Sequence, residues 1–183
     1  MRVAHATATL LVGTFASSAM GDVLDASDTG FSLAHEVIVD ASRAEAWEAA
    51  VAGIGQWWSD DHTISGIAAA MSIDAVPQGC FCEAVGAAGG VVHLTVTFVN
   101  PQVMLRMTGG LGPLGLMGVS GNMLWEFFDA DNGTLVRFSY AVGGYYPQGL
   151  DSIAGPVDAV IGDALQRLKV FAETGDADDG RVD

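Results

Sequence analysis

Basic side chains are scarce in this chain. Its 183 residues include 7 Lys and Arg against 22 Asp and Glu, which gives a formal net charge of −15 at pH 7. No cluster of Lys and Arg overrides this negative field, so the phosphate backbone of a nucleic acid or an anionic membrane surface would be repelled. We therefore expect no nucleic acid partner.

Long hydrophobic runs are also missing. No segment contains the ~20 continuous apolar residues that a transmembrane helix needs. Residues 1–21 come nearest, because they pass from Arg2 through apolar and small residues to Ala19 and Gly21, as a signal peptide does. Cleavage there would leave a periplasmic or secreted protein with no integral membrane segment. A disordered cytosolic leader is the alternative.

The chain has only two cysteines, Cys80 and Cys82, in the stretch GCFCEAVGAAGGVVHL at residues 79–94. With His93 they offer three metal ligands, but structural zinc normally needs four, and the other histidines have no suitable spacing. The pair is not a Cys-x-x-Cys motif opening a helix. An exported protein could still oxidise the pair, although a disulfide across one residue would close a very small, strained ring. We interpret both cysteines as small strand residues and predict no metal and no cofactor.

The same stretch is typical of a β-hairpin with a turn near residues 86–89. If Cys82 lies opposite His93, Glu83 points inward, although a slip of one residue would reverse every assignment. An inward Glu83 would be a buried carboxylate, which must be paired or protonated. Arg106, on a later strand, is the candidate partner.

The N-terminal third of the chain predicts a strand followed by a helix. Residues 31–40 alternate apolar and polar side chains, as a half-buried strand does. Ser42 and Glu45 have the spacing of a capping box, which begins an amphipathic helix ending near Gly53 or Gly55.

The rest of the chain predicts about six antiparallel strands and one long helix. Short β-type runs fill residues 67–143, with a tight hairpin turn at Asn132-Gly133, where positive φ angles are accessible. Apolar residues then recur at helical spacing over residues 153–171, and Gly175 marks the end of that helix.

Three stretches carry a resemblance to a known family: HEVIVDASRAEAWEAA with GQWW behind it, GGVVHLTVTFVNPQVMLRMTG, and VDAVIGDALQRLKVF. Over about residues 31–173 they resemble the START/Bet v 1-like (SRPBCC) superfamily, in its bacterial polyketide cyclase/dehydrase-like and heat-shock ATPase activator-like branch. The resemblance implies an α+β helix-grip fold, a curved antiparallel sheet of about six to seven strands wrapped around a long C-terminal helix. It also implies an apolar cavity between sheet and helix.

This resemblance sets the expected domain boundaries. We predict a signal peptide at residues 1–21, a lead-in at 22–30, the START/SRPBCC-like domain at 31–174, and an acidic disordered tail at 175–183. No internal repeat or interdomain linker is present.

Several side chains are candidates for the lining of the cavity. His35 interrupts the apolar face of its strand, although a core histidine with its own hydrogen-bond partner is the alternative. Trp58 lies where this architecture places a cavity mouth. The apolar but Gly- and Pro-rich segment 108–119 suits a mobile flap over the cavity, or else a loop packed permanently on the core. As a flap it would contact a ligand through Leu111, Leu114, Leu116 and Met117. The predicted ligand-binding residues are His35, Trp58, Glu83, Arg106, Leu114, Met117, Trp125, Phe138 and Tyr140.

Taken together, these features favour an exported protein that holds a small hydrophobic or amphipathic ligand of the lipid, polyketide or aromatic type. A cyclase, aromatase or hydrolase using a cavity carboxylate or histidine is the first alternative, although the sequence has no arrangement of nucleophile and base. A protein-interaction module like the heat-shock ATPase activators is the second.

Overall fold

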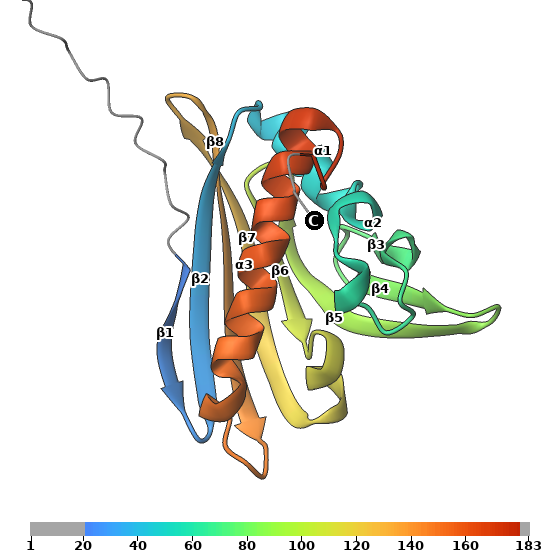
Figure 1. The fold of residues 1–183 in the computed structure, drawn as a ribbon, viewed down its shortest axis with the longest axis vertical. Coiled ribbons are helices and arrows are strands. Elements are labelled where there is room, and N and C mark those ends of the chain that lie inside the picture. The colour runs from blue at the N-terminus through green and yellow to red at the C-terminus, as the bar shows by residue number, and fades with distance from the viewer. Residues whose placement is uncertain (1–20, 180–183) are drawn as a thin grey trace, which may run out of the picture.

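The computed structural model describes residues 21–179, in which one curved, unclosed antiparallel sheet wraps around a long helix (Figure 1). The predicted signal peptide, apart from Gly21, lies outside the described residues. The eight strands follow the spatial order β1-β2-β8-β7-β6-β5-β4-β3. Their bounds are β1 Gly21–Ser27, β2 Gly30–Val39, β3 Met71–Ile73, β4 Cys80–Val85, β5 Gly89–Asn100, β6 Met104–Gly109, β7 Gly118–Ala130 and β8 Gly133–Tyr145.

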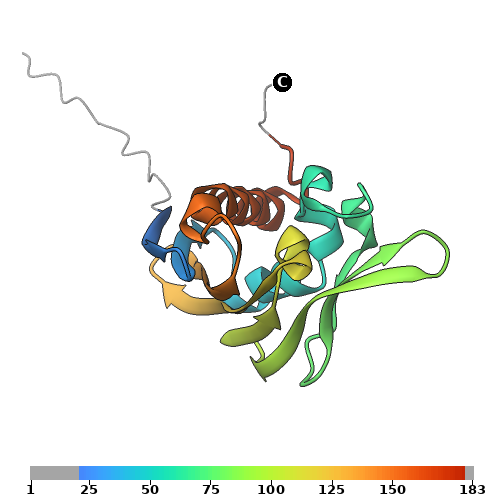
Figure 2. The same ribbon diagram turned by 90° about the horizontal axis from the view of Figure 1, so that it is seen from below.

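The long helix α3, Asp151–Thr174, lies against one face of the sheet (Figure 2). The short helices lie between β2 and β3 or before β7: α1 Arg43–Val51, α2 Ile54–Trp57, η1 Asp60–His62, η2 Ala68–Ala70 and η3 Gly112–Leu116. This arrangement confirms the predicted α+β class and helix-grip fold. No helix within residues 21–179 is long and apolar enough to cross a bilayer.

The predicted order of strand, helix, six strands and long helix is confirmed, and the sheet gains one strand at its N-terminal edge. β1 pairs antiparallel with β2, so the segment treated as a lead-in extends the sheet. Its sequence, GDVLDAS, mixes acidic and apolar residues without a clear alternation. Periodicity therefore gave no sign of this strand.

The predicted start of the first helix and the predicted end of the last helix are confirmed, whereas α1 ends at Val51, before Gly53. Ser42 and Glu45 form a reciprocal capping box at the start of α1. At the end of α3, Gly175 has a φ of 82° and its N–H donates to the Phe171 carbonyl at 2.8 Å. Glycine suits this position because a side chain disfavours the left-handed conformation.

The predicted acidic tail is ordered over its first residues. Ala177 is buried, and the Asp178 carboxylate accepts a hydrogen bond from the Arg167 guanidinium, with Nη1 and Oδ1 2.6 Å apart. The prediction of a disordered tail is therefore wrong for residues 175–179, because α3 offers them a charged partner. Residues 180–183 lie outside the described part of the chain.

The β7–β8 hairpin turns one residue earlier than predicted. Ala130 pairs with Gly133, so Asp131 and Asn132 form the two-residue loop. Gly133 has a φ of 121°, a conformation that favours glycine. Neither loop residue, Asp131 or Asn132, is among the non-glycine residues with positive φ within residues 21–179, which are Gln78 and Gln102. A Cβ atom at residue 133 would lie 2.1 Å from the Val39 carbonyl oxygen, so only glycine fits there.

Aromatic side chains fill the centre of the interface between the sheet and the helices. Trp125 stacks on Phe138 with ring centroids 4.3 Å apart, and Trp57 and Phe81 lie 6.0 Å and 6.2 Å from Trp125. All four are fully buried. Their volume occupies the place where the resemblance implied a cavity, so this part of the interface is a packed core.

Candidate ligand-binding pocket

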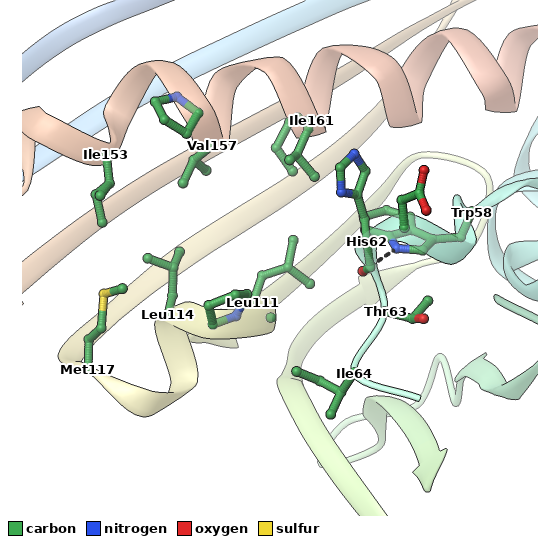
Figure 3. A pocket seen from close by; sticks show the side chains of 15 residues that line it. Trp58, His62, Thr63, Ile64, Leu111, Leu114, Met117, Ile153, Val157 and Ile161 are labelled. Carbon is green, nitrogen blue, oxygen red and sulfur yellow. Dashed lines mark hydrogen bonds between the residues drawn. The ribbon is translucent and has the colours of Figure 1, made fainter. Parts of the chain in front are cut away.

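A cavity of about 300 Å³ lies at the edge of the packed core, between α3 and two loops (Figure 3). One wall is the N-terminal half of α3, the second is the η3 segment and its flanks, and the third is the chain that follows α2. Its surface is mostly apolar. The lining residues are Trp58, Asp61, His62, Thr63, Ile64, Leu111, Gly112, Pro113, Leu114, Met117, Ile153, Pro156, Val157, Val160 and Ile161.

Three of the nine predicted ligand-binding residues line this pocket. They are Trp58, Leu114 and Met117. Trp125 and Phe138 are instead buried in the aromatic core, where stacking on each other occupies their ring faces. Periodicity placed both on the inner face correctly, but it could not distinguish a core position from a cavity wall.

Arg106 lies on the outer face of the sheet, so its prediction as a ligand-binding residue and as the partner of Glu83 is wrong. Its Nε donates to Thr97 Oγ1 at 3.1 Å, and its guanidinium lies 5.8 Å from the centroid of the Phe98 ring. The neighbouring residues Leu105 and Met107 are the buried ones in β6. Alternation along the strand therefore turns Arg106 to solvent.

His35 is a core histidine with its own partner. It is buried on β2, and its Nε2 lies 2.7 Å from Asp158 Oδ1 on α3. Gly162 allows this close approach of helix and strand, since a Cβ atom there would lie 2.7 Å from His35 Cε1. His35 therefore connects β2 to α3 and does not line the pocket.

The β4–β5 hairpin contains a bulge that changes the predicted register. Cys80 pairs with Thr95 and Phe81 with Leu94 as expected, but Cys82 pairs with Val92, which leaves His93 as the extra residue. The bulge turns His93 into the core and leaves Val92 62% exposed. The prediction that Cys82 faces His93 is thus wrong, whereas the inward direction of Glu83 is right.

Cys80 and Cys82 lie on strand β4, as predicted, and form a disulfide with each other. Their side chains share the face opposite the buried Phe81 and Glu83. The two Cα atoms are 5.4 Å apart, which is within the usual range for a disulfide. Within residues 21–179, no three His, Cys, Asp or Glu side chains are grouped to hold a metal ion.

Glu83 is the most deeply buried carboxylate near the pocket, with 1% of its surface exposed. It accepts hydrogen bonds from the backbone N–H groups of Ile64, at 3.0 Å, and Ser65, and its Oε2 lies 3.0 Å from His93 Nε2. Burial acts to raise the pKa of Glu83, but these hydrogen bonds outweigh it and lower the pKa to about 2. Glu83 is therefore ionised, and it holds the chain at residues 64–65 in place.

His93 extends this network to the second loop of the pocket. Its Nδ1 accepts a hydrogen bond from the Gly112 N–H at 3.2 Å, so a neutral His93 carries its proton on Nε2 and donates it to Glu83. Ile64 and Gly112 both line the pocket. The buried Glu83–His93 pair thus ties together two walls that are far apart in the sequence.

Tyr140 holds the start of the η3 segment through hydrogen bonds to the backbone. Its hydroxyl donates to the Gly109 carbonyl at 3.0 Å and accepts from the Leu111 N–H at 3.1 Å. Burial raises the pKa of Tyr140 to about 12, against the smaller effect of the Leu111 hydrogen bond, so the hydroxyl keeps its proton. Tyr140 therefore shapes the pocket through its loop without lining it.

These contacts support the packed-loop alternative for the Gly- and Pro-rich segment. Leu111 and Leu114 are buried, Met117 is half-buried, and Leu116 is 88% exposed. The segment forms η3, which suits its composition because Pro113 lies near the start of the helix.

Sequence reasoning missed the wall formed by α3 and most of the wall formed by the chain that follows α2. The apolar stripe of α3 was identified as facing the sheet, but periodicity cannot show which part of the stripe packs against other side chains and which part borders a cavity. The missed lining residues include Thr63 and Ile64 after η1 and Ile153, Val157, Val160 and Ile161 on α3. The apolar helix stripe was the available signal for the last four.

Comparisons with known proteins give the fold and no more. No family model matches the sequence, and no curated protein matches it either. Among solved structures, the conserved protein of unknown function EF2215 from Enterococcus faecalis matches with a TM-score of 0.61 at 17% identity, over 92% of this chain and 84% of that chain. The Aha1 dimer from Colwellia psychrerythraea matches with a TM-score of 0.56 at 20% identity, over 79% and 97%.

A third similar structure is CalU16 from Micromonospora echinospora, with a TM-score of 0.52 at 14% identity, over 85% of this chain and 84% of that chain. At these identities the likeness is one of fold. The chain thus has the helix-grip fold that its resemblance to the START/Bet v 1-like superfamily implied.

Proposed function

We propose that this protein binds a small hydrophobic or amphipathic molecule, of the lipid, polyketide or aromatic type, after export from the cytoplasm. The observation that carries the proposal is the apolar pocket beside α3. A ligand would lie against Val157 and Ile161 on the helix and against Leu114 on the opposite loop, where burial of apolar surface favours binding.

The walls of this pocket are held by interactions that do not need a ligand. The η3 segment is bound by Tyr140 and His93, and the chain after η1 is bound by Glu83. In a pocket formed in advance, the protein loops lose less conformational entropy when a ligand binds. This arrangement supports a binding role.

Two features support export. The signal-like residues 1–21 are the first, although they lie almost wholly outside the described residues. The disulfide between Cys80 and Cys82 is the second, because disulfides persist mainly in oxidising compartments.

An enzymatic role has less support. Glu83 and His93 do converge, which acid–base catalysis would require, but both nitrogens of the His93 ring are occupied and neither residue lines the pocket. Neither group can therefore reach a ligand there without breaking the loop contacts.

Native mass spectrometry tests the proposal. The full chain is expressed with its leader and recovered from the cell envelope, and native and denaturing masses are compared. We expect a chain lacking its first 19 or 21 residues, carrying an extra mass that is lost on denaturation.

A pair of variants on α3 provides the control. Val157→Trp fills the pocket and should remove the extra mass, whereas Ala159→Trp, on the exposed face of the same helix, should retain it. An unliganded wild-type chain, or an equal extra mass in both variants, would contradict binding in this pocket. An uncleaved leader would contradict export.

A further inference from the structure

We propose that the pocket selects a compact cationic amphiphile, a molecule with one short apolar chain or ring system and a protonated amine head bound at Asp61 and Trp58. This inference rests on the proposed binding function and specifies the ligand class.

The size of the pocket limits the apolar part of the ligand. A volume of about 300 Å³ is about ten times the share of one water molecule in the liquid and lies at the lower end of the range for small-molecule sites. It therefore accommodates one short chain or a small ring system. A lipid with two acyl chains does not fit within it.

The lining carries no permanently positive side chain that could pair with an anionic head, and apart from the Trp58 indole its side-chain hydrogen-bond donors are His62 and Thr63. None of the fifteen lining residues is Lys or Arg, and the whole chain has a formal net charge of −15. A carboxylate or phosphate entering the pocket would lose hydration without gaining a positive partner. An anionic amphiphile is thus the least favourable class.

The polar groups are concentrated at one end of the pocket. His62 and Thr63 lie at the end of the pocket near Trp58, whereas Ile153, Val157 and Leu114 lie towards the other end (Figure 3). Asp61, which also lines the pocket, directly precedes His62 in the chain. A ligand that buries its chain between helix and loop therefore brings its head to residues 61–63. The separation of apolar and polar lining favours an amphiphile over a wholly apolar ligand.

Asp61 supplies an uncommitted negative charge at this end. The neighbouring Asp60 accepts a hydrogen bond from the Ala68 N–H at 2.6 Å, whereas no residue within 21–179 binds the Asp61 carboxylate. Asp61 thus lines the pocket with its charge unpaired. An ammonium group, which keeps its proton at neutral pH, is the complementary head.

Trp58 adds a second feature that suits a cation. Its indole N–H donates to the His62 carbonyl at 3.0 Å, which fixes the ring and uses its only polar group. The ring is 3% exposed and packs against Trp57 and Phe81, with centroids 5.6 Å away in both cases, so a ligand meets only the part of its aromatic surface that lines the pocket. Tryptophan is the side chain that attracts cations best through this surface. An amine head between Asp61 and Trp58 would interact favourably with both.

Three probes with the same ten-carbon chain test the head group: decylamine, decan-1-ol and decanoate. The amine and decanoate are titrated below their critical micelle concentrations and the alcohol below its solubility limit, each into the folded protein at pH 7, and binding is followed by calorimetry. We expect the amine to bind about three- to tenfold more tightly than the alcohol, and decanoate most weakly. Because Asp61 is exposed, added salt should narrow the difference.

Asp61→Asn should remove the preference for the amine and leave the affinity for the alcohol unchanged. Asp131→Asn, in the β7–β8 turn, makes the same change in net charge at a position outside the pocket lining and should retain the preference. Equal binding of amine and alcohol, tighter binding of decanoate, or an equal loss of amine affinity in the two variants would overturn the inference while leaving the pocket as a binding site. Failure of all three probes to bind would instead count against the proposed binding function.

Discussion

The two ends of α3 pack against the rest of the molecule in different ways. Towards its C-terminus, Leu165 and Leu168 are fully buried in the same hydrophobic core as the aromatic cluster of Trp57, Trp125 and Phe138. Towards its N-terminus, half-buried residues such as Val157 border the pocket, and the opposite wall is a loop rich in glycine. One continuous apolar stripe thus serves both a packed core and a cavity, and the residues facing it decide which.

The largest expected effect is a loss of stability when a large side chain is removed from the packed core. Trp125→Ala should destabilise the fold by about 3–5 kcal/mol, because it removes a fully buried indole and leaves a cavity among other aromatic rings. Val157→Ala, at the pocket, should cost about 1 kcal/mol because that side chain is already half-exposed. Urea denaturation of both variants measures the contrast, and similar losses for the two would contradict it.

The second effect tests whether the buried charge of Glu83 stabilises the fold beside the pocket. The pKa of Glu83 is lowered from 4.5 to about 2, so its ionised form contributes stability above about pH 4.5 that is lost as the pH falls towards 2. This linkage corresponds to about 3 kcal/mol. The stability of Glu83→Gln should therefore lie below that of the wild type at pH 7 and approach it near pH 2.

Denaturation at a series of pH values compares the two proteins, so that the other carboxylates contribute equally to both. Glu45→Gln is a matched control, since the pKa of that exposed carboxylate is also lowered by its hydrogen bonds with Ser42, but it lies at the start of α1. Parallel pH profiles for the wild type and Glu83→Gln would show that Glu83 does not hold the fold through its charge.

The third effect separates the two loops that His93 joins. His93→Gln keeps a hydrogen-bond donor near Glu83 but loses the hydrogen bond from the Gly112 N–H. His93→Asn keeps an acceptor near the Gly112 N–H but loses the hydrogen bond to Glu83. We expect the Gly112 amide to exchange with solvent about fivefold faster in the Gln variant, the equivalent of one hydrogen bond of about 1 kcal/mol. NMR-detected hydrogen exchange measures this, and identical exchange in the two variants would refute separate anchoring.

The smallest effect concerns a single hydroxyl. Tyr140→Phe keeps the buried ring and removes the hydrogen bonds to Gly109 and Leu111, so it should cost about 1 kcal/mol and loosen η3. Thr97→Ala, on the outer face of the sheet, should leave ligand affinity unchanged. Calorimetry with the decyl probes compares them, and an unaltered affinity for Tyr140→Phe would show that this tether does not shape the pocket.

Much of the fold could be predicted because it depends on periodicity along short segments. The buried faces of β2 and β8, the capping box at Ser42 and the glycine stop of α3 each follow from residues close together in the chain. β1 escaped prediction because its pairing with β2 is set by its position at the sheet edge and not by an alternating pattern. The bulge at His93 escaped for a similar reason, since one extra residue leaves local composition unchanged.

The site was predictable only in part. Trp58, Leu114 and Met117 were identified from their places in connecting segments, whereas Arg106 was assigned to the wrong face and Trp125 and Phe138 to a cavity that their own rings fill. Whether an inward side chain packs against another or borders an empty space depends on volumes contributed by distant elements.

The sequence by itself determined the architecture, because alternating and helical patterns of apolar residues specify which face of each strand and helix is buried. Only the tertiary structure decided where the pocket lies and which residues hold its walls. Its lining comes from residues 58–64, 111–117 and 153–161, and Glu83, His93 and Tyr140 hold two of these segments in place. Such contacts join residues that are far apart in the chain, and no local pattern encodes their distances.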